Sequence, residues 1–201
     1  VGDIFGWKNK ETNLRKYRTV FIEVPRKNGK STLCAAIGLY MLFADEERGS
    51  EVYSAAGDRS QAGIVFEIAK GMLLQNKELS QRGKAYRNSI VNESKGNYYQ
   101  AISSDSKTKH GFNANCIIFD ELHTQPNRDL WDTLTTSTGS RRQPLTIAIT
   151  TAGYDKQSIC YELYSYAKKV LEQTILDDSF YAVIYESEND DDISLESTWK
   201  K

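Results

Sequence analysis

The residues best suited to chemistry lie near the start of the chain, in the segment VPRKNGKST at residues 24–32. Closely spaced backbone N–H groups ahead of a helix can bind phosphate oxygens, and a lysine in the same loop can reach the outer phosphates. In the phosphate-binding pattern G-x-x-x-x-G-K-[ST], Gly29, Lys30 and Ser31 take the last three places, while Val24 stands where the first glycine is expected. We expect Lys30 to contact the β- and γ-phosphates and Ser31 to place its hydroxyl on Mg²⁺. From these residues alone, a nucleotide site and an unrelated loop both remain open.

Two carboxylates follow an apolar segment in CIIFDE, residues 116–121. An aspartate at the end of such a strand can hold the Mg²⁺ shell of a nucleotide, which suits Asp120. A glutamate directly after it points in another direction and can orient and deprotonate the attacking water, which suits Glu121. The alternative is that both acids cap the next helical turn. The occurrence of both motifs in one chain favours the nucleotide site.

Two cations inside the loop, Arg26 and Lys27, extend this hypothesis. An arginine beside the phosphates can stabilise charge on the transferring group, so we expect Arg26 to point inward and Lys27 to point to solvent. The remaining loop residues expected to contact the nucleotide are Asn28 and Thr32.

The apolar segment LTIAIT, residues 145–150, leads into a run of small residues, which are Thr150, Thr151, Ala152 and Gly153. Hydroxyl residues followed by glycine at this place could sense the γ-phosphate or the activated water. By themselves they would indicate only a turn.

The elements that must position these residues alternate along the chain. Apolar, β-branched or aromatic segments predict strands at 17–24, 51–56, 116–122, 145–150 and 180–185, with shorter strands around 89–91 and 98–102. Helical spacing predicts helices over 33–43, after an N-cap at Asp58, around Leu130 and Trp131, and near 158–174. We therefore predict an α/β domain with a mostly parallel sheet covered on both faces. The loops after residues 24, 56, 119 and 150 should meet at one edge of that sheet.

Composition limits the remaining possibilities. The 201 residues are 39% hydrophobic and 26% charged, with a formal net charge of −1, so nucleic-acid contact would have to come from a local patch. The densest basic cluster is Lys107, Lys109 and His110, for which a nucleic-acid role and a plain polar loop both remain open. The apolar stretch 33–43 is too short to span a bilayer. Three well-separated cysteines, in apolar surroundings, are expected to be buried and reduced, as in a cytosolic protein: Cys34, Cys116 and Cys160.

Four segments, VPRKNGKST, EVYSAAGDRSQA, KHGFNANCIIFDELH and ITTAG, resemble in this order the ATPase domain of tailed-bacteriophage large terminase subunits, which are DNA-packaging motors. The resemblance runs from about Phe5 to the C-terminus. It implies a P-loop NTPase fold of the ASCE, RecA-like kind, with a mostly parallel central β-sheet flanked by helices. Phosphate loops in this family commonly lack the first glycine, so Val24 does not argue against ATP binding.

The resemblance also implies roles for individual residues. Lys30 and Ser31 would be the phosphate and Mg²⁺ contacts, Asp120 the Mg²⁺-associated acid and Glu121 the catalytic base. Arg26 matches an arginine often found early in the family's loop. Thr150, Thr151 and Gly153 match the coupling motif, which links hydrolysis to motion.

The implied setting is a homo-oligomeric ring in the host cytoplasm that uses ATP and Mg²⁺ on double-stranded DNA, with a portal protein and a small terminase subunit as partners. A cation from a neighbouring subunit would complete the site, and its candidates are Arg59, Arg141 and Arg142.

Residues 1–185 would form the motor domain, with FGWKNK at 5–10 as the tail of an adenine-side segment whose earlier part is absent. Residues 186–201 would be an acidic linker toward a nuclease domain. The alternatives are a helicase-like DNA-dependent ATPase and a nucleotide-binding assembly or DNA-binding module that hydrolyses little.

Overall fold

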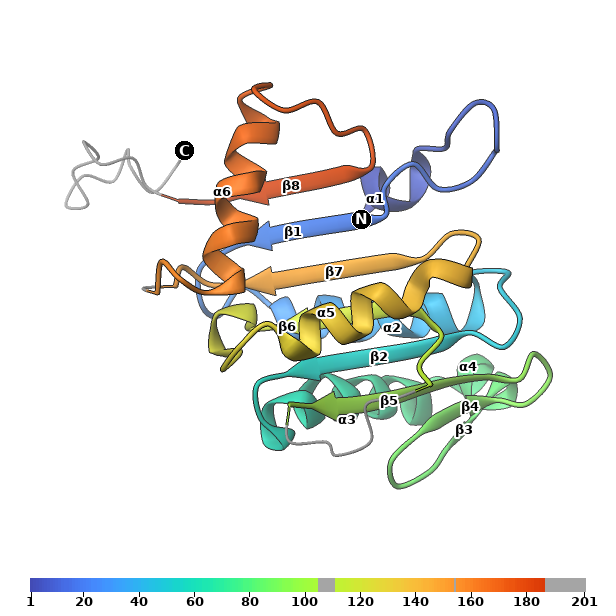
Figure 1. Ribbon diagram of the computed structural model, residues 1–201. Helices are drawn as coiled ribbons and strands as arrows, with labels where there is room; N and C mark the ends of the chain where they lie inside the picture. Colours follow the sequence, from blue (N-terminus) through green and yellow to red (C-terminus); the bar gives the residue numbers. More distant parts are fainter. Residues whose placement is uncertain (105–110, 154, 187–201) are drawn as a thin grey trace, which may run out of the picture.

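A computed structural model describes residues 1–104, 111–153 and 155–186. In this part of the chain a single sheet runs through the middle of the molecule, with strands in the order β3-β4-β5-β2-β6-β7-β1-β8 (Figure 1). The strands are β1 (Thr19–Glu23), β2 (Glu51–Ala56), β3 (Lys84–Ala85), β4 (Ile90–Asn92), β5 (Asn97–Ser103), β6 (Ala114–Asp120), β7 (Leu145–Thr150) and β8 (Phe180–Ile184). Neighbours from β5 to β8 pair in parallel, and β3, β4 and β5 pair antiparallel at one side.

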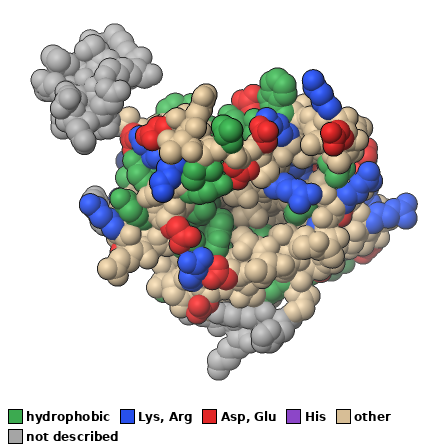
Figure 2. All heavy atoms as spheres, turned by 45° about the horizontal axis from the view of Figure 1, so that its top comes forward, with side chains coloured by type: hydrophobic (Ala, Val, Ile, Leu, Met, Phe, Trp, Pro, Cys, Tyr) green, Lys and Arg blue, Asp and Glu red, His purple; other side chains and the backbone are tan. Residues whose placement is uncertain are grey.

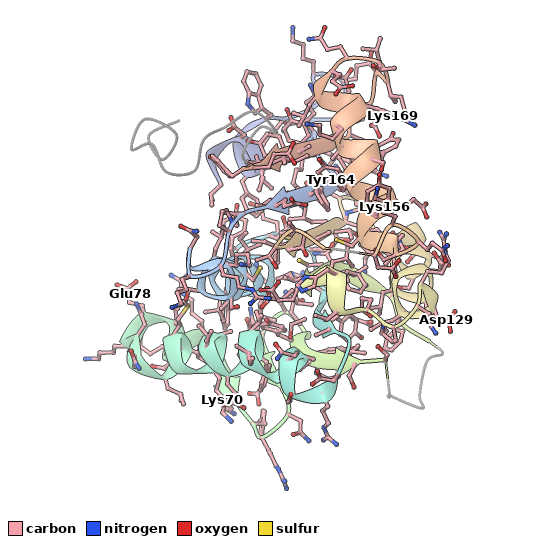
Figure 3. All side chains as sticks on the ribbon, turned by 90° about the vertical axis from the view of Figure 1, so that its left-hand side faces the viewer. Lys70, Glu78, Asp129, Lys156, Tyr164 and Lys169 are labelled. Atoms are coloured by element: carbon pink, nitrogen blue, oxygen red, sulfur yellow. The ribbon has the colours of Figure 1, made fainter. Side chains whose placement is uncertain are left out.

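Helices cover both faces of the sheet. In Figure 1, α2 and α3 lie behind it, and α5 and α6 lie in front. The helices are α1 (Gly2–Gly6), α2 (Lys30–Phe43), α3 (Arg59–Gln75), α4 (Lys77–Arg82), α5 (Asp129–Thr136) and α6 (Ile159–Leu171), with short 3-10 helices η1 (Leu122–Thr124) and η2 (Ser137–Ser140). Figure 3 looks onto the edge where the parallel strands end. Tyr164 of α6 and Asp129 of α5 lie on one side there, and Lys70 of α3 and Glu78 of α4 on the other.

Strand side chains alternate between two cores, one under each helical layer. Ile118 of β6 and Ile147 of β7 pack in the core with α2 and α3, whereas Phe119 and Ala148, one residue further on, pack in the core with α5 and α6. Because successive side chains of a strand point to opposite faces, a strand buried on both faces is mostly apolar along its length. This confirms the predicted mostly parallel sheet with both faces covered.

The predicted elements agree closely with the observed ones. The strands at 51–56 and 145–150 have the predicted bounds, and Asp58 caps α3 by accepting hydrogen bonds from the amides of Ser60 and Gln61. A further hydrogen bond from the Ser60 hydroxyl, at 2.6 Å, is the main cause that holds the pKa of the Asp58 carboxyl below its usual range, and the Gln61 amide adds to it. The predicted strand 116–122 was too long: it ends at Asp120, because Glu121 adopts a left-handed backbone with φ +51°. The ends of β1, β2, β6 and β7 meet at one edge, as predicted.

The opposite edge, where the parallel strands begin, is closed by a buried polar network. Arg15 Nη1 donates to Asp45 Oδ1 at 3.0 Å, and Asn115 and Gln143 donate to the same carboxylate at 3.1 and 3.2 Å. The segment 5–10 lies at this edge too, since Phe5 packs against Tyr40 near the end of α2, with ring centroids 4.5 Å apart. The residues FGWKNK are therefore far from the loop at the beginning of α2.

Other expectations concern the surface and the thiols. Basic and acidic side chains are interspersed over the face in Figure 2, in keeping with the near-zero net charge. The three cysteines are buried and free, as predicted. Within the described residues, no helix has the length and apolar character needed to cross a membrane.

Candidate nucleotide site

The loop between β1 and α2 is shaped by its own side chains and backbone. Asn28 Nδ2 donates to the carbonyls of Pro25 and Arg26, at 3.1 and 3.2 Å. Gly29, the residue before α2, has φ +71°, a left-handed conformation that glycine adopts at little cost. The loop thus turns back directly into the helix N-terminus, which is the arrangement an anion needs.

Lys30 has its side chain folded into this loop. The residue is 7% exposed, and Nζ lies 3.5 Å from the Val24 carbonyl oxygen and 3.3 Å from that of Pro25. Glu121 Oε1 lies 3.5 Å from the same nitrogen. The ammonium group therefore links the phosphate loop to the acidic end of β6.

Ser31 and Asp120 make the closest contact between the two motifs. Ser31 Oγ donates to Asp120 Oδ2 at 2.7 Å, although 89 positions separate them in the sequence. The contact exists because β7 alone separates β1 from β6, and all three parallel strands end at one edge. Asp120 is 5% exposed, and its burial raises the pKa of its carboxyl group.

Asp120 also provides a test of whether these residues suit a magnesium ion. Its Oδ1 is buried and has no hydrogen-bond partner. A buried carboxylate oxygen without a partner is costly, and oxygen is the ligand atom that Mg²⁺ prefers. The hydroxyl of Ser31 lies beside it, so the donor set fits a Mg²⁺ ion held through Ser31 and Asp120.

Glu121 leaves the strand direction sharply. Its left-handed backbone is uncommon for a residue with a side chain, and such outliers concentrate at functional sites. Although Glu121 precedes η1, its side chain makes no capping hydrogen bond there, which argues against the helix-capping alternative. Its carboxylate instead has Lys30 at Oε1, with His123 Nδ1 and Thr151 Oγ1 at 3.3 and 3.4 Å from Oε2.

The end of β7 lies directly beside this carboxylate. Thr150 is fully buried, and its hydroxyl donates to the Thr151 carbonyl at 2.8 Å. Cys160 of α6 lies below, with Sγ 3.7 Å from the same hydroxyl. Burial raises the pKa of this thiol to about 11, so it is neutral at physiological pH. Thr151 thus contacts Glu121, and Thr150 and Gly153 lie against His123; the coupling role of these residues stays a prediction.

Comparisons with known proteins show which family the chain belongs to. Residues 1–169 match the family model described as "Terminase large subunit, ATPase domain". The chain belongs to this family. It is 30% identical over 187 residues to the terminase large subunit of Enterobacteria phage HK97, and 25% identical over 209 residues to that of Lactococcus phage p2. These alignments cover 89% and 98% of this chain but only 35% and 37% of the relatives, so the chain spans about a third of their length.

Solved structures show the same fold. The large terminase of bacteriophage HK97 superposes with a TM-score of 0.80 at 27% identity, over 91% of this chain and 38% of that one. The large terminase ATPase domain of Thermus phage P74-26 superposes with a TM-score of 0.64 at 15% identity, over 99% of this chain and 86% of that one. The fold of this terminase ATPase domain is therefore the P-loop, ASCE type expected from the sequence.

Several residues that were expected to contact the nucleotide, or to reach a neighbouring subunit, are exposed. Arg26 and Lys27 are exposed in the phosphate loop, Thr32 is exposed on the first turn of α2, and Arg59 is exposed at the start of α3. The inward direction of Arg26 stays a prediction.

Arg141 lies at the opposite edge of the sheet. Its guanidinium donates to the carbonyls of Arg48, Gly49 and Asn113 and ties the beginnings of β2 and β6 together. Arg59 and the exposed Arg142 are therefore the better candidates to reach a neighbouring subunit. The basic cluster Lys107, Lys109 and His110 lies outside the described residues, as do residues 187–201 of the expected linker.

His123 is the residue that sequence reasoning left without a role. It contacts both Glu121 and Thr150, and Nδ1 lies 2.9 Å from the Thr150 hydroxyl. The spacing in D-E-L-H, with the histidine one short turn after the acids, was the available signal. Without the bend at Glu121, however, that spacing does not show where the ring points.

Proposed function

We propose that this domain hydrolyses ATP with Mg²⁺, and that hydrolysis powers translocation of double-stranded viral DNA into a procapsid. The observation that carries the proposal is the Ser31–Asp120 hydrogen bond, accompanied by the Lys30–Glu121 ion pair. These contacts join the phosphate loop to both carboxylates that phosphoryl transfer to water needs. Large terminases of the same fold from a thermophilic bacteriophage, solved with ATP-gamma-S and with ADP, add support for the nucleotide.

Each side chain has a defined task in this reaction. Lys30 exchanges the carbonyls of Val24 and Pro25 for the outer phosphates, and the loop N–H groups bind the remaining phosphate oxygens. Ser31 and Asp120 would hold Mg²⁺, which supplies neutralisation of the phosphate charge. Glu121 takes the proton of the attacking water as the new P–O bond forms and the bond to the ADP oxygen breaks. We propose that Arg26 stabilises the charge of the transferring group.

The larger assembly is part of the same proposal. We propose that residues 1–185 form the motor domain and that residues 186–201 lead toward a nuclease domain. The partners are double-stranded DNA, which is bound independently of its sequence, a portal protein and a small terminase subunit. The domain would act in a homo-oligomeric ring at the procapsid, in the host cytoplasm. A helicase-like ATPase on the same core is the alternative, and so is a nucleotide-binding assembly or DNA-binding module that hydrolyses little by itself.

The test of the base is Glu121→Gln, which retains the size of the side chain but cannot accept the proton. We expect kcat to fall by about 10²–10⁴-fold, with ATP still bound. The matched control is Glu78→Gln on the exposed surface of α4, labelled in Figure 3, which should hydrolyse ATP at the wild-type rate. Normal turnover in the Glu121 variant would refute the assignment.

Dilution then separates the alternatives. A rate per subunit that is constant on dilution indicates a self-contained site, with Arg26 as the arginine that acts. A rate that rises with protein concentration indicates completion by a neighbour, and the variants to make are then Arg59→Ala and Arg142→Ala. ATP binding without turnover at any concentration supports the module that hydrolyses little.

A further inference from the structure

One side chain connects the end of β6 to the end of β7 at the site. His123 stands in η1, two residues after Glu121, and its side chain is about three-quarters buried. Nδ1 lies 2.9 Å from Thr150 Oγ1 and 3.3 Å from Glu121 Oε2. A single nitrogen thus faces an oxygen of the proposed base and a hydroxyl of the proposed coupling segment.

The hydrogen bonds around Thr150 determine which ring nitrogen carries the proton. The Thr150 hydroxyl has one hydrogen, and it is donated to the Thr151 carbonyl at 2.8 Å. The contact with His123 must then be donated by the imidazole. Glu121 Oε2 is an acceptor as well, so a hydrogen on Nδ1 satisfies both neighbours, whereas a lone pair on Nδ1 would face two oxygens.

The coupling segment also lies close to the backbone and the Cβ of His123. A Cβ placed on Gly153 would come within 3.1 Å of His123 Cβ, tighter than ordinary packing. The backbone amide of His123 also donates to Thr150 Oγ1, at 3.4 Å. The segment from Thr150 to Gly153 therefore contacts His123 at its amide and at its ring, and leaves little room for a side chain at Gly153 beside the His123 Cβ.

We propose that His123 is a positioning residue, whose Nδ1–H is shared between Glu121 and Thr150 and connects the base to the coupling segment. The inference rests on the proposed function of Glu121 and adds a physical connection to it. When phosphates draw Lys30 away from Oε1, the contact of His123 Nδ1 with Oε2, at 3.3 Å, still holds the carboxylate. A movement of the end of β7 then changes the position of the base, and a movement of Glu121 changes the position of Thr150.

The tautomer can be measured without any turnover, which separates this inference from the proposed function. The chain has two histidines, His110 and His123, so ¹⁵N-labelled imidazole spectra of the wild type and of His110→Gln assign the His123 signals. We expect His123 to be protonated at Nδ1 and, in its neutral form, unprotonated at Nε2. Protonation at Nε2 alone would overturn the proposal, whether or not the domain hydrolyses ATP.

Kinetics test the positioning role. His123→Ala should lower kcat by about 10²-fold, the scale of a misplaced catalytic group, with little change in ATP affinity. His123→Asn places an amide N–H near the position of Nδ1 and should recover activity to within about tenfold of the wild type, one hydrogen bond being the remaining difference. A purely structural role would not be rescued by the shorter amide.

A double-mutant cycle tests the connection to Thr150. Thr150→Val removes the hydroxyl, and we expect His123→Ala to slow this variant far less than it slows the wild type. The matched surface control, Thr136→Val at the exposed end of α5, should leave the effect of His123→Ala undiminished. Multiplicative effects of the His123 and Thr150 variants would refute the connection. An inactive wild type would refute the proposed function and leave the tautomer as the test of the contact.

Discussion

Replacing Asp120 with asparagine should stabilise the ligand-free domain and remove most of the stabilisation that magnesium nucleotide gives. Asp120 is almost fully buried, Oδ2 accepts from Ser31, and Oδ1 has no partner. Burial is the main cause that raises the pKa of this carboxyl group, and the nearby charge of Glu121 adds to it. The site thus contains a charge that the protein by itself does not fully compensate.

The magnitude follows from that burial. An unsatisfied buried polar group costs about 1–3 kcal/mol, and the amide removes the charge while leaving one group without a partner. We therefore expect Asp120→Asn to raise the free energy of unfolding by about 1 kcal/mol, or about 2–4 °C in Tm for a chain of this length. Wild type with magnesium ATP at 100 times its Kd should gain about 2.7 kcal/mol, and the variant should lose most of this gain.

The raised pKa of Asp120 determines the direction in which folding stability changes with pH. Because the folded pKa of Asp120 lies above the ordinary value, the folded protein binds more protons than the unfolded chain between these two values. Wild-type stability therefore falls as pH rises through this window, and the penalty is complete above the folded pKa. The advantage of Asp120→Asn should be full at neutral pH, shrink as pH falls through the folded pKa, and vanish below the ordinary one.

Thermal unfolding from acidic to neutral pH, with and without magnesium ATP, measures both effects. Ser31→Ala is the companion variant, since it removes the hydrogen bond to Asp120 and leaves the charge in place. A ligand-free Asp120→Asn protein that is less stable than the wild type at neutral pH would refute the reasoning. So would an advantage that does not change with pH.

Two further predictions concern residues away from the carboxylates. Asp45→Ala should lower stability by about 3–5 kcal/mol, because it leaves the buried Arg15 charge unpaired; denaturant unfolding measures this, and a loss below 1 kcal/mol would contradict it. Gly29→Ala should cost about 1–2 kcal/mol, because φ is +71° and open space surrounds the site, so the cost is conformational. The same variant should weaken ATP binding in a titration, and unchanged stability and affinity would show that the loop does not need its left-handed turn.

Much of the site could be predicted from local patterns. Strands buried on both faces are mostly apolar along their length, so β2 and β7 were located with their bounds. The Gly-Lys-Ser sequence and the two acids at the end of β6 indicated chemistry because of the positions they take at the ends of strands. The N-cap of α3 was equally local, since Asp58 bonds amides two and three residues away.

Contacts between distant residues were decided by the tertiary structure. Ser31 meets Asp120 across 89 positions only because β7 inserts between β1 and β6 in a parallel sheet. Arg141 was a candidate for reaching a neighbour, and its guanidinium instead binds three carbonyls at the opposite edge. No local pattern specifies such partners, because they depend on strand order and on where each chain segment returns to the sheet.

At the site itself, the two acids and the phosphate loop were predictable from local patterns, whereas the direction of Glu121 and the contacts of His123 were not. The sequence by itself determined that two acids end a buried strand and that a phosphate loop precedes them. Only the fold determined that Glu121 turns into a left-handed conformation, and that His123 is thereby brought against Glu121 and Thr150. The physical reason is that hydrophobic periodicity reports which residues are buried, whereas the meeting of polar groups depends on long-range packing that offsets the cost of an unusual backbone.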